Sequence, residues 1–150
     1  MYKKYLTLIT QKGNPLPQII NWYGKLDVRK LNRQDYRDIP RRLLLEMRTG
    51  RDTVYPDIMV EPVLMVSGEA MEIIKLYDSS IPFIFVALFD TQKEESRSYY
   101  CPVLAEDNFH QEEVLYRVKR LNGFEIKICE ELVESLLSRG AVGLELRVGN

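Results

Sequence analysis

Residues 114–140 read VLYRVKRLNGFEIKICEELVESLLSRG, and this stretch contains the clearest structural signal in the chain. Apolar residues occupy every second position on both sides of Asn122-Gly123. They are Val114, Tyr116 and Val118 before it, and Phe124, Ile126 and Ile128 after it. Alternation with a period of two is typical of half-buried strands, and a short loop containing Asn-Gly commonly joins antiparallel strands. The stretch therefore predicts a β-hairpin.

The register of this hairpin depends on the length of its loop. A two-residue loop Asn122-Gly123 would place charged Arg117 opposite apolar Ile128 on the same face. A three-residue loop starting at Leu121, with Gly123 at positive φ, pairs apolar residues with each other instead. The predicted pairs are Val118 with Ile126, Tyr116 with Ile128, and Lys119 with Glu125. We therefore expect one buried face formed by Tyr116, Val118, Phe124, Ile126 and Ile128.

Two amphipathic helices are predicted. The first begins after Ser67, a favourable N-cap residue, and ends near Asp78, with an apolar stripe of Ala70, Ile73, Ile74 and Tyr77. The second spans residues 130–139, begins after Cys129, carries acids in its first turn and is capped by Gly140. Both apolar stripes are expected to face the core.

The remaining strand signals complete an α+β pattern. Strands are predicted at residues 2–9, 83–89, 98–104 and 141–148, the middle two forming a hairpin. The continuous apolar run 83–89 indicates a strand covered on both faces, and Pro102 indicates an edge or bulge. We expect a single α+β domain in residues 1–150, with a mixed or antiparallel sheet built from hairpins and two or three packed helices.

Charge is divided unevenly along the chain. Residues 1–51 contain 12 Lys/Arg and 4 Asp/Glu, whereas residues 52–150 contain 9 and 18, although the net charge is only −1. The sequence thus predicts a basic, weakly patterned N-terminal part and an acidic α+β core. Such asymmetry either presents a basic face to an anionic partner or lets the two parts attract each other.

The irregular basic part leaves a nucleic-acid hypothesis open. Between Lys25 and Arg51 there are nine Lys/Arg and four Asp/Glu, with Tyr23 and Tyr36 nearby. Cations bind phosphates and aromatic rings stack on bases, so residues 25–51 could form a module for nucleic acid or another anionic partner. The interspersed acids and the pI of about 5.9 argue against it.

Residue patterns for catalysis, cofactors and metals are weak. No glycine-rich phosphate loop occurs, and His110 is the only histidine, too few for a zinc site with Cys101 and Cys129. Both cysteines are expected to be reduced. We expect no enzyme activity, no cofactor and no metal.

Three acidic pairs lie in loop-like sequence between strands, and they are the candidate partner-binding residues. They are Glu94-Glu95, Glu106-Asp107 and Glu112-Glu113. Adjacent acids in a loop are most often a solvated edge, but together they could attract a basic protein partner.

The longest apolar run, residues 81–89, is too short for a membrane-spanning helix, which needs about 20 residues. The first residues lack the cleavage pattern of a signal peptide. A cytoplasmic location and no membrane partner are expected.

The C-terminal part resembles a known family, immunity-protein family eleven of bacterial polymorphic toxin systems. The resemblance covers residues 114–146 and consists of Leu115-Tyr116-Arg117-Val118, Asn122-Gly123-Phe124, Ile126, Ile128, Glu130-Glu131-Leu132, Leu136, Gly140 and Gly143. It implies an immunity protein that binds and neutralises a cognate toxin without catalysis or cofactor. Cys129 stands where the family commonly has a serine-like N-cap. A nucleic-acid module and an unrecognised enzyme are the competing hypotheses.

Overall fold

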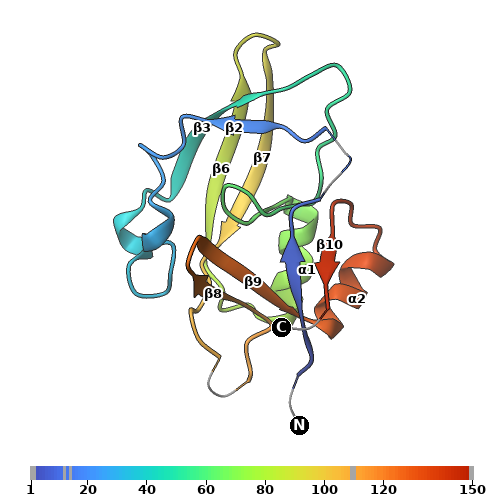
Figure 1. The fold of residues 1–150 in the computed structure, drawn as a ribbon. Helices are drawn as coiled ribbons and strands as arrows, with labels where there is room; N and C mark the ends of the chain where they lie inside the picture. The colour runs from blue at the N-terminus through green and yellow to red at the C-terminus, as the bar shows by residue number, and fades with distance from the viewer. Residues whose placement is uncertain (1–2, 12, 14, 109–110, 149–150) are drawn as a thin grey trace.

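The computed structural model describes residues 3–11, 13, 15–108 and 111–148, which form an α+β domain with two β-sheets and two α-helices (Figure 1). One sheet has four antiparallel strands. In spatial order they are β10 (Glu145–Arg147), β1 (Tyr5–Ile9), β9 (Gly123–Cys129) and β8 (Leu115–Arg120). The expected fold class is confirmed.

The second sheet has six strands and is mixed, because β3 and β6 are parallel while the other neighbours are antiparallel. In spatial order the strands are β2 (Gln18–Ile20), β3 (Arg42–Arg48), β6 (Phe83–Asp90), β7 (Glu95–Pro102), β5 (Met65–Val66) and β4 (Ile58–Met59). The hairpin of β6 and β7 extends to the top of the molecule (Figure 1). The strand that contains Pro102 is not an edge strand as expected, because β7 lies between β6 and β5; Pro102, which cannot donate to the ladder, is instead the last residue of β7.

The two helices, α1 (Gly68–Tyr77) and α2 (Glu130–Ser138), pack side by side on one flank (Figure 1). The Ser67 side chain accepts a hydrogen bond from the backbone N–H of Ala70 at 3.1 Å, which confirms the predicted N-cap. Cys129 makes no capping bond. At the other end of α2, Gly140 has φ 81° and its N–H donates to the carbonyl of Leu137, so the predicted C-cap is also confirmed.

The basic N-terminal part is more ordered than its sequence indicates. It contains two short 3₁₀ helices, η1 (Val28–Lys30) and η2 (Tyr36–Asp38), followed by β3 in the interior of the six-stranded sheet. Leu43, Leu45 and Met47 point into the core, and exposed Leu44 between them hides the alternation in the sequence. The last strand, in contrast, is shorter than expected and begins only at Glu145.

The register predicted for the β8–β9 hairpin is wrong by one residue. Arg120 pairs with Gly123 across a two-residue loop, so that Arg117 lies opposite Ile126 and Tyr116 opposite Lys127. Gly123 has φ 122°, and its positive φ is the confirmed part of the prediction. Tyr116 and Val118 therefore lie on the other face from Ile126 and Ile128.

The buried charge of Arg117 explains this register. Its side chain is 3% exposed, and its guanidinium lies 3.7 Å from the centre of the Phe124 ring. It also donates to Glu106 at 2.7 Å and to the carbonyl of Val28 at 2.9 Å. Glu106 and Val28 lie outside the hairpin, so the alternation of residues within the hairpin could not predict that Arg117 faces inward.

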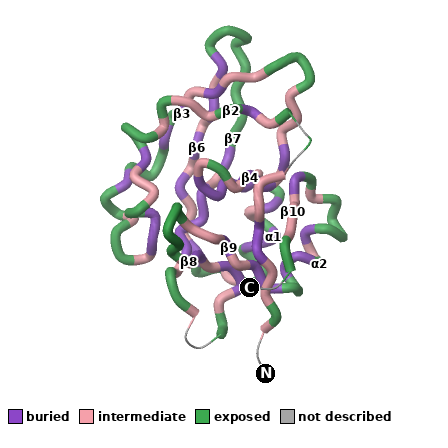
Figure 2. The backbone as a smooth tube through the Cα atoms, in the orientation of Figure 1, coloured by how far each residue is buried: buried purple, intermediate pink, exposed green. Residues whose placement is uncertain are grey.

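Two hydrophobic clusters form the interior, and buried backbone extends through both sheets in Figure 2. One cluster lies between the four-stranded sheet and the helices and includes Leu8, Ile74, Ile128 and Leu132. The other lies inside the curled six-stranded sheet and includes Leu45, Val86, Tyr99 and Cys101. Tyr77, predicted as core, is 37% exposed and donates to the carbonyl of Glu131 instead.

Candidate binding surface

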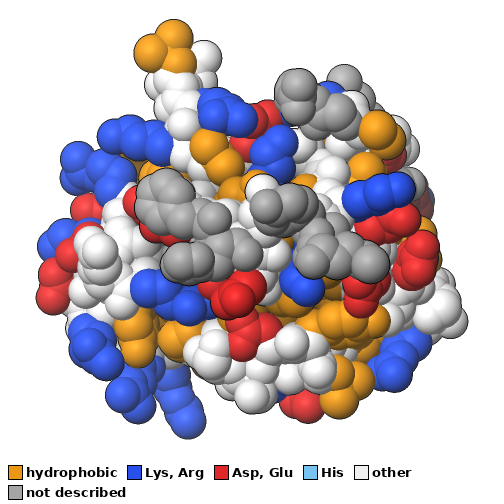
Figure 3. All heavy atoms as spheres, turned by 90° about the horizontal axis from the view of Figure 1, so that it is seen from below, with side chains coloured by type: hydrophobic (Ala, Val, Ile, Leu, Met, Phe, Trp, Pro, Cys, Tyr) orange, Lys and Arg blue, Asp and Glu red, His pale blue; other side chains and the backbone are white. Residues whose placement is uncertain are grey.

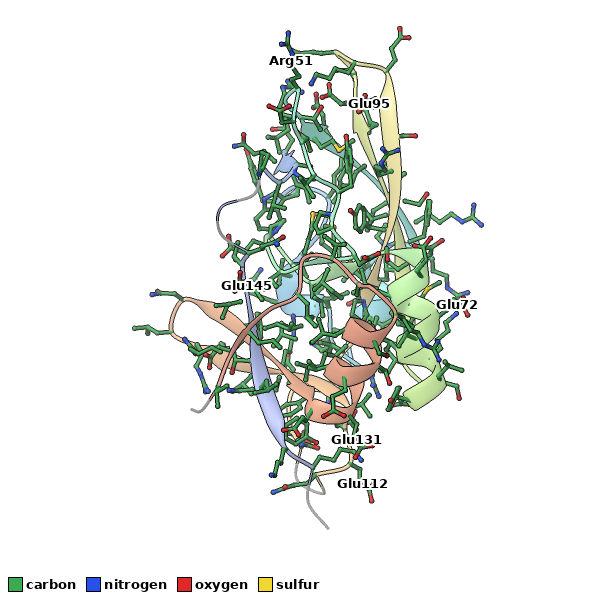
Figure 4. All side chains as sticks on the ribbon, turned by 90° about the vertical axis from the view of Figure 1, so that its right-hand side faces the viewer. Arg51, Glu72, Glu95, Glu112, Glu131 and Glu145 are labelled. Atoms are coloured by element: carbon green, nitrogen blue, oxygen red, sulfur yellow. The ribbon has the colours of Figure 1, made fainter. Side chains whose placement is uncertain are left out.

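The three acidic pairs do not form one surface. Glu94 and Glu95 are at the turn between β6 and β7, whereas the other two pairs lie in the connection from β7 to β8. Figure 4 labels Glu95 and Glu112, which are at opposite ends of the molecule. A single partner footprint containing all three pairs would therefore have to span the whole length of the domain.

Two of the four acids in the connection from β7 to β8 are engaged within the fold. Glu106 binds Arg117 at 2.7 Å, and Glu113 lies 3.6 Å from the guanidinium of Arg33. Burial lowers the pKa of Arg117, and the hydrogen bonds that Arg117 donates to Glu106 only partly offset that effect. These two carboxylates therefore have structural roles, while Asp107 and Glu112 remain exposed.

Glu95 takes part in a smaller polar cluster. Its carboxylate accepts a hydrogen bond from the Tyr55 hydroxyl at 2.9 Å, and the Arg97 guanidinium lies 4.2 Å from the centre of the Tyr55 ring. Burial, and then the hydrogen bond to Glu95, raise the pKa of Tyr55. Glu94 next to it is exposed and has φ 53°.

The basic segment 25–51 is partly neutralised by acids, most of them from the segment itself. The ion pairs within it are Arg29–Asp27, Lys30–Asp38 and Arg48–Glu46, and Arg33–Glu113 joins it to the acidic part. On the lower face of the molecule, acidic side chains also lie between the Lys and Arg side chains (Figure 3). This arrangement weakens the nucleic-acid hypothesis, since a phosphate track needs unpaired cations.

The outward face of the six-stranded sheet carries an apolar row that the sequence interpretation missed. The strand pairing places Leu44 beside Ala87, Phe85 beside Tyr100, and Phe89 beside Ser96. Leu44 is 55% exposed, whereas Phe85, Ala87 and Phe89 are half-buried. We call Leu44, Phe85, Ala87 and Phe89 the outer-sheet surface.

The border of the outer-sheet surface is polar and contains cations. Arg42 and the serines Ser96 and Ser98 are exposed beside it, and Lys25 donates to the carbonyl of Leu44 at 3.0 Å. At the α1 end, the Lys75 ammonium lies 5.8 Å from the centre of the Phe83 ring. An apolar centre with a polar border is the usual anatomy of a protein interface.

Strand 83–89 was expected to be covered on both faces, but only one of its faces is fully buried. Ile84, Val86 and Leu88 are buried, but the alternate residues are not completely covered. A continuous apolar run does not distinguish a strand buried on both faces from one whose second face is available to a partner. No signal in this sequence alone separated the two.

Among the residues that the structure describes, the cysteines and the potential metal ligands form no thiol or metal site. Cys101 and Cys129 are both buried and free, and His110 lies outside the described residues. In residues 3–11, 13, 15–108 and 111–148, His, Cys, Asp and Glu form no group of three or more suited to a metal ion. No helix within those ranges is long and apolar enough to cross a membrane.

No family model matches this sequence, and no curated protein matches it significantly.

Proposed function

We propose that this protein is an immunity protein, which binds a cognate bacterial toxin stoichiometrically in the cytoplasm and neutralises it without catalysis. The observation that carries the proposal is the outer-sheet surface, in which Leu44, Phe85 and Phe89 present apolar side chains from two paired strands. Aromatic and aliphatic side chains at the centre of an interface commonly supply most of its binding energy. The resemblance of residues 114–146 to immunity-protein family eleven supports the same class of function.

The chemistry of this surface also indicates its partner. Arg42 and Lys25 are exposed at its border, whereas the carboxylate of Glu46 is bound by Arg48 at 2.8 Å. A toxin domain with an apolar patch bordered by carboxylates would be complementary to it. The acidic pairs are then secondary: Asp107 and Glu112 are free to steer a partner, but they are not beside the apolar row.

Co-expression with the toxin domains encoded by neighbouring genes tests the proposal. The wild-type protein should restore growth and form a complex with one of these domains. Leu44→Glu should abolish protection, because it buries a carboxylate against the toxin's own carboxylates. Leu121→Glu is the matched control, since Leu121 is 99% exposed at the β8–β9 turn of the other sheet.

Three results would contradict parts of this proposal. If the wild-type protein protects against none of the neighbouring toxins, the immunity function is wrong. Protection by Leu44→Glu equal to that of the wild type would remove the outer-sheet surface from the mechanism. A concentration-dependent dimer in the absence of toxin that Leu44→Glu dissociates would make this surface a self-association interface.

A further inference from the structure

A cavity of about 860 Å³ lies between the two sheets. Phe124 and Ile126 of β9 line it on one side, and Ile19 of β2, Met59 of β4 and Leu104 line it elsewhere. Most of the lining is apolar, and the volume is within the range of pockets that hold small organic ligands. The cavity shares no lining residue with the outer-sheet surface, so binding of a ligand there does not depend on the proposed toxin interface.

Arg117 brings a buried positive charge to this cavity. Its Nε and Nη2 both donate to Glu106, its Nη1 donates to the carbonyl of Val28, and Nη2 also approaches the carbonyl of Arg29. A guanidinium has five N–H donors, so one N–H of Nη1 has no partner among the described residues. The side chain of Glu106 is 39% exposed, and water therefore weakens its attraction for Arg117.

The charged residues that line the cavity favour an anion. They are Arg29, Glu61 and Arg117. Arg29 and Glu61 are exposed, so Arg117 is the only one of the three whose charge is buried. Burial lowers the pKa of Arg117 by more than Glu106 raises it. A second negative charge nearby would therefore further stabilise the charged form of the guanidinium.

Gln11 supplies a second incomplete polar group. Its Oε1 is buried against the cavity wall and accepts no hydrogen bond from the described residues. A buried acceptor normally receives a hydrogen bond, and the folded state is less stable when that bond is not formed. An ionised carboxylate has no donor to offer Gln11, so this unpaired acceptor marks a polar point on the wall and does not by itself select an anion.

From this geometry we propose that the cavity binds a small amphipathic carboxylic acid, with its apolar body between Ile19 and Phe124 and its carboxylate at Arg117. The buried guanidinium then recognises the ligand's charge, and the apolar walls recognise its hydrocarbon. Charge-assisted hydrogen bonds of this kind are about twice as strong as neutral ones. Without the carboxylate, affinity should fall by roughly tenfold or more.

Trp22 provides a direct readout, because it lines the cavity and is the only tryptophan in the chain. We would titrate the protein with 10-bromodecanoate and, as a matched probe, 10-bromodecanol, both below the concentration at which they aggregate. Bromine quenches indole fluorescence only at close range. The proposal requires saturable quenching by the acid and at least about tenfold weaker quenching by the alcohol. No saturable quenching, or equal affinity for the two probes, overturns it.

Two variants locate the binding. Val28→Phe narrows the cavity beside the Arg117 guanidinium and should weaken binding of the acid. Leu76→Glu should not, because Leu76 is exposed on α1 and does not line the cavity. Arg117→Met combined with Glu106→Gln removes both charges together and should make the affinities for acid and alcohol equal. Circular dichroism verifies the fold of each variant. If the folded double variant keeps its preference for the acid, or if Val28→Phe binds the acid as tightly as the wild type, the site is wrong.

Discussion

Gly143 packs so closely against Pro56 that a Cβ added to Gly143 would lie 2.3 Å from the Pro56 Cβ. It would also lie 2.9 Å from the carbonyl oxygen of Ile58, and Gly143 has φ 94°. Two hydrogen bonds of 2.7 Å between Val142 and Asp57 join the same two segments. A side chain at this position would therefore push the segment before β10 away from the six-stranded sheet.

We predict that Gly143→Ala lowers the free energy of unfolding by about 2–4 kcal/mol, because the positive φ and the steric overlap add. Urea denaturation followed by circular dichroism measures this change. Gly24→Ala is the control, since a Cβ there meets nothing within 4 Å, and it should shift stability by less than about 0.5 kcal/mol. Equal stability of the two variants would show that the close packing is not required.

Replacing Glu106 should lower the free energy of unfolding by more than replacing its partner Arg117. Glu106→Gln leaves a guanidinium with 3% exposure without its carboxylate and should cost about 2–3 kcal/mol. Arg117→Met leaves Glu106, which water reaches, and places an apolar side chain beside Phe124, so its cost should be smaller. Chemical denaturation of the two single variants and the double variant measures the coupling. A larger loss for Arg117→Met than for Glu106→Gln would contradict this account.

The two thiols should react slowly in the folded protein. Burial raises the pKa of Cys101 to about 12, and it also raises the pKa of Cys129. Because the thiolate is the nucleophile, we expect native reaction with Ellman's reagent at pH 8 to be slower than denatured reaction by on the order of a hundredfold. Two thiols should titrate after denaturation. Rapid labelling of either cysteine in the native state would show that it is accessible.

Local patterns predicted those features of the fold that depend on neighbouring residues. Ser67 caps α1 and Gly140 ends α2, because each cap involves backbone groups within a few positions along the chain. The hairpin of β8 and β9 was also predicted. Its register was not, because the position of Arg117 is determined by Glu106 and by the carbonyl of Val28, which both lie outside the hairpin.

Long-range pairing was the main feature that the sequence did not reveal. β3 lies parallel to β6, with Leu44 beside Ala87, although the two residues are far apart in the chain and no local pattern links them. The outer-sheet surface depends on this pairing, so the sequence could not define it. The acidic pairs, in contrast, were easy to see as sequence but were separated by the fold, with Glu95 and Glu112 at opposite ends (Figure 4).

The last prediction concerns Asp90, a buried carboxylate at the end of β6. It accepts hydrogen bonds from the Thr49 hydroxyl at 2.7 Å, the Thr49 N–H at 3.1 Å and the Gln92 N–H at 3.0 Å. These hydrogen bonds hold the pKa of Asp90 below its ordinary value, and the bond from the Thr49 hydroxyl has the largest effect. The charged form is thus favoured by folding.

The direction of the pH dependence follows from this lowered pKa. In the unfolded chain Asp90 has the ordinary pKa of about 3.9, so its contribution to stability is fully present above that pH. It is lost as the pH falls through the lower pKa of the folded state, where the carboxylate becomes protonated in both states. Asp90→Asn should therefore be less stable than the wild type at pH 7, and the difference should shrink progressively below pH 4.

Urea denaturation from pH 7 to the lowest pH at which both proteins fold tests this, with exposed Asp107→Asn as the control. A difference between wild type and Asp90→Asn that stays constant over this range would mean that the charge of Asp90 does not stabilise the turn between β6 and β7.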